Sequence, residues 1–428
     1  MTKIPTTATR SPSGTPKCGG FKAVGFGIVL GLVASTVWAV WLSGPSVRQP
    51  TSTAPPPPSA ETLAARCVEK NLTPRQRLGQ LLMLGVQGAG VSGTMDEVAA
   101  LFDDYSIGGV MVMSAPPDTY GDNAMLLRFK ASQATPIFVT VDQEGGPVQR
   151  IGYPSVHERI FSATEVGRLP AYERTRYIDE TVLPMYRFLK TKGYDGVLAP
   201  VVDIGRAQDG PLPGRTFSTD PDTVANVADA YVKAAASAGL AAFKKHAPGL
   251  GEAVRYDGST AGNTDQAPMV TPEWSVIRDR SLKPYGSGDN VMMGTQTVPG
   301  LTTERADSQH PAALSPAAVS LMRTIVGGSA LIMTDDVNTP SVLGYMTSKG
   351  VTENALAVAA LEAWRAGVDI VAVVRPDPAA WNTLLEHIIT EGAAAMKTDK
   401  KLTDGITRSV VRFMRLKHVD PCVLPQTG

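Results

Sequence analysis

Apolar residues form two alternating patterns in this chain, between about residues 79 and 374. Short runs that are apolar at nearly every position are typical of strands buried on both faces of a parallel sheet. They predict eight strands, at 79–86, 108–113, 137–142, 196–204, 240–246, 290–296, 330–335 and 368–374. Stretches with apolar residues at helical spacing lie between most of these runs and predict helices, for example at 95–103, 221–236, 316–326 and 352–366.

Eight strand–helix units in about 350 residues predict an α/β fold, namely a single (β/α)8 TIM-type barrel with insertions. A doubly wound open sheet is the alternative. In a barrel, functional side chains gather at the carboxyl ends of the strands. The predicted strands carry charged residues at that end, namely Asp142, Asp203, Lys245, His246 and Asp335.

The first 66 residues lack this pattern and divide by composition into three segments. Residues 1–22 carry cations and no acidic residue, and residues 23–42 are uncharged and long enough to cross a bilayer as one helix. Residues 43–66 are rich in Pro, Ser and Thr, as in an extended linker. We therefore expect a cytoplasmic tail, one transmembrane helix and an extracytoplasmic barrel at 67–428, held in the cell membrane. Secretion after cleavage of a signal peptide is the alternative.

Charge and cysteine content narrow the expected partners and compartment. Lys plus Arg and Asp plus Glu balance at 40 each, and no basic stripe occurs in the body of the chain, so no nucleic-acid partner is expected. Cys67 and Cys422 flank the predicted barrel. In an exported protein they could form a disulfide that joins the ends of the domain, and two free thiols are the alternative.

The segment 141–150 combines closely spaced charged and polar side chains with two glycines. It continues the predicted strand at 137–142 and contains Asp142 and Glu144, followed by Gly145 and Gly146. Two glycines allow a sharp turn and a close approach of the backbone to a bound molecule. Because ligands bind at strand ends in parallel α/β folds, this loop is expected to line a site.

Several segments together resemble glycoside hydrolase family 3, and within it the bacterial β-N-acetylglucosaminidase branch. They follow the order of the family motifs, and they are 79–83 (GQLLM), 107–110 (IGGV), 141–146 (VDQEGG), 199–204 (APVVDI), 215–218 (RTFS), 245–251 (KHAPGLG), 311–315 (PAALS) and 334–336 (TDD). The resemblance implies a retaining glycosidase in which Asp335 is the nucleophile that forms a glycosyl ester. It also implies that the terminal sugar is held by Asp142, Arg215, Lys245 and His246.

Three further carboxylates near these motifs are expected to have supporting roles. Asp336 should point away from its neighbour Asp335, because strand side chains alternate, and should orient the loop. Glu144 is expected to brace its loop. Asp203 is left open between a role in the site and a helix N-cap.

The loop after the fifth predicted strand departs from the resemblance. The branch carries its general acid/base histidine there in an Asp-Ser-His sequence, whereas residues 251–268 contain no histidine. Asp257, Asp265 or Glu252 would have to take that role, or activity would be low. Further departures are the replacement of an Arg, a Phe and a His of the family by Pro147, Ala247 and, at or next to its position, Gln296.

These observations predict an exported glycosidase that hydrolyses terminal β-linked N-acetylglucosamine or a related sugar and acts in cell-wall turnover. The alternative is a catalytically impaired barrel that binds a glycan or a protein partner. Neither a metal nor another cofactor is expected.

Overall fold

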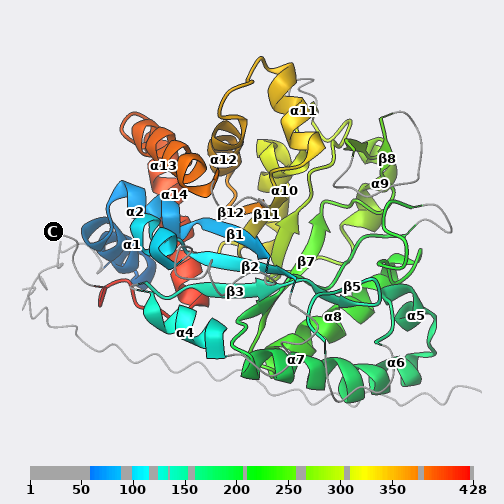
Figure 1. Ribbon diagram of the computed structural model, residues 1–428. Coiled ribbons are helices and arrows are strands. Elements are labelled where there is room, and N and C mark those ends of the chain that lie inside the picture. The colour runs from blue at the N-terminus through cyan, green and yellow to red at the C-terminus, as the bar shows by residue number, and fades with distance from the viewer. Residues whose placement is uncertain are drawn as a thin grey trace, which may run out of the picture. The chain divides into compact units, whose positions relative to one another are not determined.

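Eight parallel strands close into one barrel in the computed structural model, which describes residues 58–87, 99–114, 124–133, 135–152, 160–205, 210–256, 267–302, 309–374 and 380–424. Their order around the barrel is β1-β12-β11-β10-β7-β6-β3-β2, and β1 pairs with both β2 and β12. Figure 1 shows β1 beside β2. The strands are β1 (Leu82–Gln87), β2 (Gly109–Ser114), β3 (Phe138–Val141), β6 (Gly196–Val197), β7 (Ala241–Ala247), β10 (Asn290–Met293), β11 (Ile332–Asp336) and β12 (Ile370–Val374). The predicted barrel is confirmed, and the open sheet is excluded.

Helices surround the barrel, most of them against its outer face (Figure 1). They are α1 (Ala60–Asn71), α2 (Pro74–Gln80), α4 (Ala124–Ser132), α5 (Ala163–Arg168), α6 (Ala171–Tyr177), α7 (Leu183–Thr191), α8 (Pro221–Ser237), α9 (Trp274–Ser281), α10 (Pro316–Val326), α11 (Pro340–Ser348), α12 (Ala355–Ala366), α13 (Trp381–Met396) and α14 (Lys400–Leu416). A further helical stretch at 99–105 overlaps the helix predicted at 95–103, whose first residues lie outside the described part of the chain.

Local sequence signals explain where these helices start. The side chain of Asp220 caps α8 by accepting a hydrogen bond from Thr223 N at 2.8 Å, and Pro221 occupies the first turn, where its missing N–H costs nothing. Ser315 and Pro316 begin α10 in the same way. Each of these helices then buries an apolar stripe against the barrel, and every fully buried Val, Leu or Met contributes about 1.5–3 kcal/mol.

Two predicted strands differ from the observed ones. Residues 79 and 80 form the last turn of α2 and not the start of a strand. The helix starts at Pro74, after a capping box of Thr73 and Gln76, and β1 begins only at Leu82. The predicted strand at 196–204 is regular only over β6, because Pro200 lacks an N–H for the ladder. The chain nevertheless stays beside β7, since Pro200 O accepts from Lys245 N at 3.1 Å.

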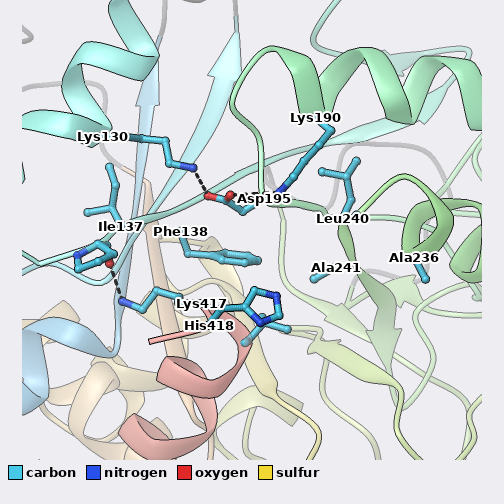
Figure 2. Close-up of a pocket in the computed structure, with 13 residues that line it drawn as sticks. Lys130, Ile137, Phe138, Lys190, Asp195, Ala236, Leu240, Ala241, Lys417 and His418 are labelled. Atoms are coloured by element: carbon cyan, nitrogen blue, oxygen red, sulfur yellow. Dashed lines mark hydrogen bonds and ion pairs between the residues drawn. The ribbon is translucent and has the colours of Figure 1, made fainter. Parts of the chain in front are cut away.

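The amino-terminal end of the barrel contains a cavity of about 380 Å³ (Figure 2). Asp195, directly before β6, pairs with Lys130 at 2.5 Å and with Lys190 at 3.7 Å. Lys417, after α14, donates to Gln80 Oε1 at 2.7 Å and to the carbonyls of residues 108 and 136 at 3.2 and 2.9 Å. Burial lowers the pKa of Lys417 to about 7, while Asp195 acts in the opposite direction. These bonds occupy the three donors of the ammonium, so Lys417 fastens α14 to the barrel.

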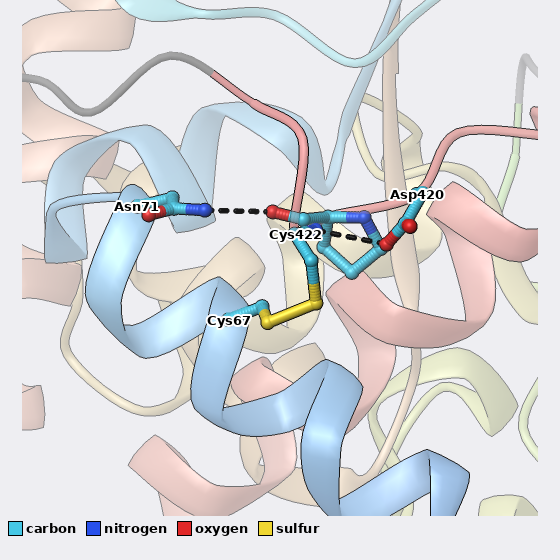
Figure 3. The surroundings of a disulfide bond; sticks show 5 residues. Cys67, Asn71, Asp420 and Cys422 are labelled. Carbon is cyan, nitrogen blue, oxygen red and sulfur yellow. Dashed lines mark hydrogen bonds between the residues drawn. A yellow bond between two sulfur atoms is a disulfide. The ribbon is translucent and has the colours of Figure 1, made fainter.

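Both ends of the domain meet at α1. Cys67 on α1 forms a disulfide with Cys422, with Cα atoms 4.9 Å apart, and this is the pairing that the sequence predicts (Figure 3). Beside it, Asn71 Nδ2 donates to the carbonyl of Pro421 at 2.9 Å. A crosslink between residues so far apart in sequence restricts the unfolded chain and stabilises the fold by about 2–4 kcal/mol.

The start of the folded region lies earlier than the composition suggests. Helix α1 begins at Ala60, inside the stretch 43–66 that the composition predicts as linker, because Ser59 caps it by accepting from Thr62 N. The predicted membrane segment at 23–42 lies outside the described residues. Within the described ranges, no helix is both long and apolar enough to cross a membrane.

Candidate active site

Charged side chains converge at the carboxyl ends of three strands. Asp142 directly follows β3, Lys245 and His246 lie near the end of β7, and Asp335 lies near the end of β11. The structure joins them into two contacts, Lys245 with Asp142 and His246 with Asp335. The residues that the sequence assigns to sugar binding and to the nucleophile therefore lie at one end of one barrel, where loops such as those carrying β5 and β8 extend beyond the strands (Figure 1).

The Lys245 ammonium is the centre of a buried ion-pair network. Its Nζ lies 2.6 Å from Asp142 Oδ1 and 2.7 Å from Glu144 Oε1, and its side chain is 2% exposed. Arg215 extends the network by a bidentate bond to Glu144, with Nε and Nη2 each 2.9 Å from a carboxylate oxygen. Arg150 approaches the outer oxygen of Asp142 at 3.8 Å.

The network sets the charge states of its members. Burial alone would raise the pKa of the Glu144 carboxyl, but Lys245 and Arg215 together outweigh burial and lower this pKa to about 2. Burial alone would lower the pKa of Lys245, and Asp142 and Glu144 reverse that effect and raise it. Both groups are therefore ionised at neutral pH, and their bonds hold Asp142 and Arg215 in fixed orientations.

The Gly-Gly pair forms the sharp turn expected of it. Glu144 lies on a short hairpin of β4 (Gln143–Gly145) and β5 (Val148–Gln149). Gly145 and Gly146 have φ of +90° and +55°, and a Cβ on Gly146 would lie 2.5 Å from the Cα of Ser162. The glycines thus also let the hairpin pack closely against the segment before α5.

His246 is held between two carboxylates. Its Nδ1 lies 2.7 Å from Asp203 Oδ2, and its Nε2 lies 3.9 Å from Asp335 Oδ2. Asp203 is 1% exposed and also accepts hydrogen bonds from the backbone N–H groups of His246 and Leu250. In the neutral ring, the bond to Asp203 places the hydrogen on Nδ1 and leaves Nε2 able to accept a hydrogen bond from a hydroxyl group.

Asp203 is therefore a positioning residue for His246, and the N-cap role left open by the sequence is wrong. A signal for this role existed in the sequence. Asp203 ends the apolar run next to the one that ends in Lys245 and His246, and consecutive strands of a barrel are neighbours.

Asp335 and Asp336 make different contacts, as expected for neighbouring residues whose side chains alternate along a strand. Asp336 Oδ1 accepts from Asn338 N at 2.8 Å and from Val374 N at 2.9 Å, which ties the loop after β11 to β12. Asp335 Oδ1 accepts from Asp336 N at 2.8 Å, and its side chain is 32% exposed. A carboxylate that is oriented yet accessible has what a nucleophile requires.

The residues that depart from the family motifs pack within the protein or lie on its surface. Gln296 is buried and donates through Nε2 to the carbonyl of Gly249 at 3.2 Å, Ala247 is buried, and Pro147 is exposed. Glu252 forms an ion pair with Arg280 of α9 at 3.1 Å, so it is engaged outside the site. The other two acid/base candidates, Asp257 and Asp265, lie outside the described residues.

Known proteins resemble this chain over the whole barrel. Residues 73–412 match the family model of the glycosyl hydrolase family 3 N terminal domain. The β-hexosaminidase LpqI of Mycobacterium tuberculosis is 29% identical over 89% of this chain and 91% of its own length. A solved structure of a GH3-family glycosyl hydrolase from Mycobacterium smegmatis has a TM-score of 0.65 and 27% identity, and the match covers 81% of this chain and 97% of that one. The β-N-acetylhexosaminidase of Beutenbergia cavernae shares the fold with a TM-score of 0.66 at 24% identity, over 82% of this chain and 100% of that one.

The network around Glu144 predicts a loss of stability in acid. The pKa of the Glu144 carboxyl is about 2 in the folded protein, against an ordinary value of 4.5 for a glutamate in the unfolded chain. The stabilisation that follows from this difference is fully present above pH 4.5 and is lost as the pH falls toward 2. The free energy of unfolding should fall by about 2 kcal/mol through this group between about pH 5 and about pH 3. Urea unfolding of Glu144→Gln and of the unchanged protein at both pH values measures this. The two stabilities should converge as the pH falls, and a constant difference would contradict the prediction.

Proposed function

The chain belongs to glycosyl hydrolase family 3, and from this membership we propose that it hydrolyses terminal β-linked N-acetylglucosamine with retention of configuration. The observation that carries the proposal is Asp335, an oriented and accessible carboxylate at the tip of β11, beside His246 and its buried charged neighbours. The β-hexosaminidase names of the relatives support the choice of sugar.

In this mechanism Asp335 attacks the anomeric carbon while the bond to the leaving-group oxygen breaks, and a glycosyl ester forms. A general acid gives a proton to the departing oxygen. It then takes a proton from the water that attacks the ester, so that the carboxylate and the acid are both restored. Asp142, Arg215, Lys245 and His246 bind the hydroxyls of the terminal sugar, since charged partners make strong hydrogen bonds to neutral groups.

The general acid/base is proposed to be Asp257 or Asp265, because both lie in the loop that follows β7 and Glu252 of the same loop is paired with Arg280. A second candidate function rests on the same loop. Its lack of a histidine, together with Pro147 and Ala247, supports a barrel that binds a wall glycan without rapid turnover.

The location is proposed to be the outer side of the cell membrane, with residues 23–42 as the anchor and the wall as the source of substrate. Two features support it. The apolar segment is long enough to cross a bilayer, and the Cys67–Cys422 disulfide is typical of an oxidising compartment.

Replacing the nucleophile should stop turnover without unfolding the protein. We expect Asp335→Ala to lower kcat for an aryl β-N-acetylglucosaminide by about 10³-fold or more, because no ester can form. Added azide should restore turnover and give the α-glycosyl azide, because azide can attack the anomeric carbon from the position that the Asp335 carboxylate occupies in the unchanged protein. Asp336→Asn serves as the matched control for charge removal at the next position. An unchanged rate in Asp335→Ala would disprove the assignment.

Replacing the general acid should affect substrates according to their leaving group. In the variant that removes it, Asp257→Asn or Asp265→Asn, kcat/KM for a disaccharide should fall by about 10²–10⁴-fold. Cleavage of the bond to a dinitrophenyl leaving group should change little, because that group departs without a proton. If neither variant separates the two substrates, the acid lies elsewhere. Calorimetric binding of a wall disaccharide that is not hydrolysed would favour the second candidate function.

Thiol labelling in intact cells tests the location. With an impermeant reductant and an impermeant maleimide, Cys67 and Cys422 should be labelled and Cys18 should not. After lysis, label on Cys18 in the same polypeptide would show that the anchor is retained. Labelling of Cys67 and Cys422 only after lysis would rule out an extracytoplasmic barrel.

A further inference from the structure

A short hairpin lies at the end of the barrel that carries the candidate active site. It pairs β8 (Val254–Arg255) with β9 (Met269–Val270) and follows β7, the strand that carries Lys245 and His246. In Figure 1, β8 lies with α9 beyond the carboxyl end of β7.

Contacts from three loops hold this hairpin in place. Backbone bonds join Met269 and Thr271 to Thr297, which lies in the loop after β10. The N–H of Met269 also donates to Ser341 Oγ on α11, which follows Asp335. A small apolar cluster lies beneath the hairpin, formed by Val201, Leu212, Leu250, Ala253 and Met269. The hairpin is therefore a fixed part of the rim.

Tyr256 directly follows β8 and presents an aromatic ring on this hairpin. The residue is 61% exposed, although its hydroxyl lies 2.8 Å from Oγ1 of Thr297, a residue that is 7% exposed. The polar tip is thus anchored in the loop after β10 while the ring remains open. Anchoring reduces the conformational entropy that the side chain would lose when a ligand covers it.

From this geometry we infer that Tyr256 is the platform for the sugar on the leaving-group side of the cleaved bond, an inference that rests on the proposed function. The exposed face of an aromatic ring is apolar and carries the negative side of its quadrupole, which suits the weakly positive C–H face of a pyranose. Tyr256 is a specificity-determining residue for the aglycone.

The residues proposed for the terminal sugar are buried, whereas the residue proposed for the leaving-group sugar is exposed. The groups proposed to hold the terminal sugar are deep in the site, with Lys245 2% and His246 4% exposed. A terminal sugar seated on them projects the rest of the substrate outward to the rim. Tyr256 lies on that rim, on the loop that continues from the Lys245-His246 segment.

Two substrates separate this role from the rest of the site. The first is the β-1,4-linked disaccharide of N-acetylglucosamine, and the second is N-acetyl-β-glucosaminyl fluoride, whose leaving group has no ring and departs without a proton. In the full-length protein, Tyr256→Ala should raise KM for the disaccharide about three- to tenfold. The same variant should leave the fluoride kinetics within about twofold.

Matched variants distinguish the ring from its anchor. Tyr256→Phe keeps the ring and loses the bond to Thr297, so KM for the disaccharide should rise less than in Tyr256→Ala. Tyr172→Ala removes another exposed tyrosine, on α6, and should change neither substrate.

Calorimetric titration of the disaccharide keeps the test decisive if turnover is slow. Weaker binding in Tyr256→Ala, by about three- to tenfold, supports the platform whether or not the sugar is cleaved. Equal effects on both substrates, or equal disaccharide affinity in Tyr256→Ala and the unchanged protein, would overturn the inference alone. Failure of the unchanged protein to hydrolyse either substrate would overturn the proposed hydrolysis, and the calorimetry would still decide the role of Tyr256.

Discussion

The buried ammonium of Lys245 is the constraint on which the active-site end of the barrel depends. A charge that is 2% exposed is tolerated only when it is fully paired, and Asp142 and Glu144 supply the pairing from the end of β3 and from the hairpin that follows it. Glu144 in turn holds Arg215, so that three separate segments are fixed by one cation. Loss of one partner from such a network typically costs about 3–5 kcal/mol, because another charge is left buried and unpaired.

The same strand also supplies the second part of the site. His246 follows Lys245, so the backbone that places the ammonium places the imidazole as well. Asp203 then fixes the ring through Nδ1, which leaves Nε2 on the side of Asp335. Buried polar bonds thus arrange His246 beside Asp335, whose own side chain is 32% exposed.

The two ends of the barrel use buried charge for different purposes. At the amino-terminal end, Lys417 and Asp195 connect helices and strand ends, and the disulfide of Cys67 joins the first helix to the end of the chain. At the carboxyl-terminal end, the ion pairs hold side chains ready for a ligand. The contacts that close the domain therefore lie at the opposite end of the barrel from the loops after β7 and β10.

The sequence by itself determined the strands and helices and favoured a barrel, because the periodicity of apolar residues in a segment shows how that segment is buried; the closure of the sheet came from the tertiary structure. It also placed Asp142, Lys245, His246 and Asp335 at strand ends, and it offered Cys67 and Cys422 as a disulfide or as two free thiols, between which the structure decides for the disulfide. Only the tertiary structure decided that Glu144 holds both Lys245 and Arg215, that Asp203 orients His246, and that the hydroxyl of Tyr256 is anchored by Thr297. These pairs join segments that are far apart in the chain, and their geometry follows from the register and closure of the strands, which no single segment contains.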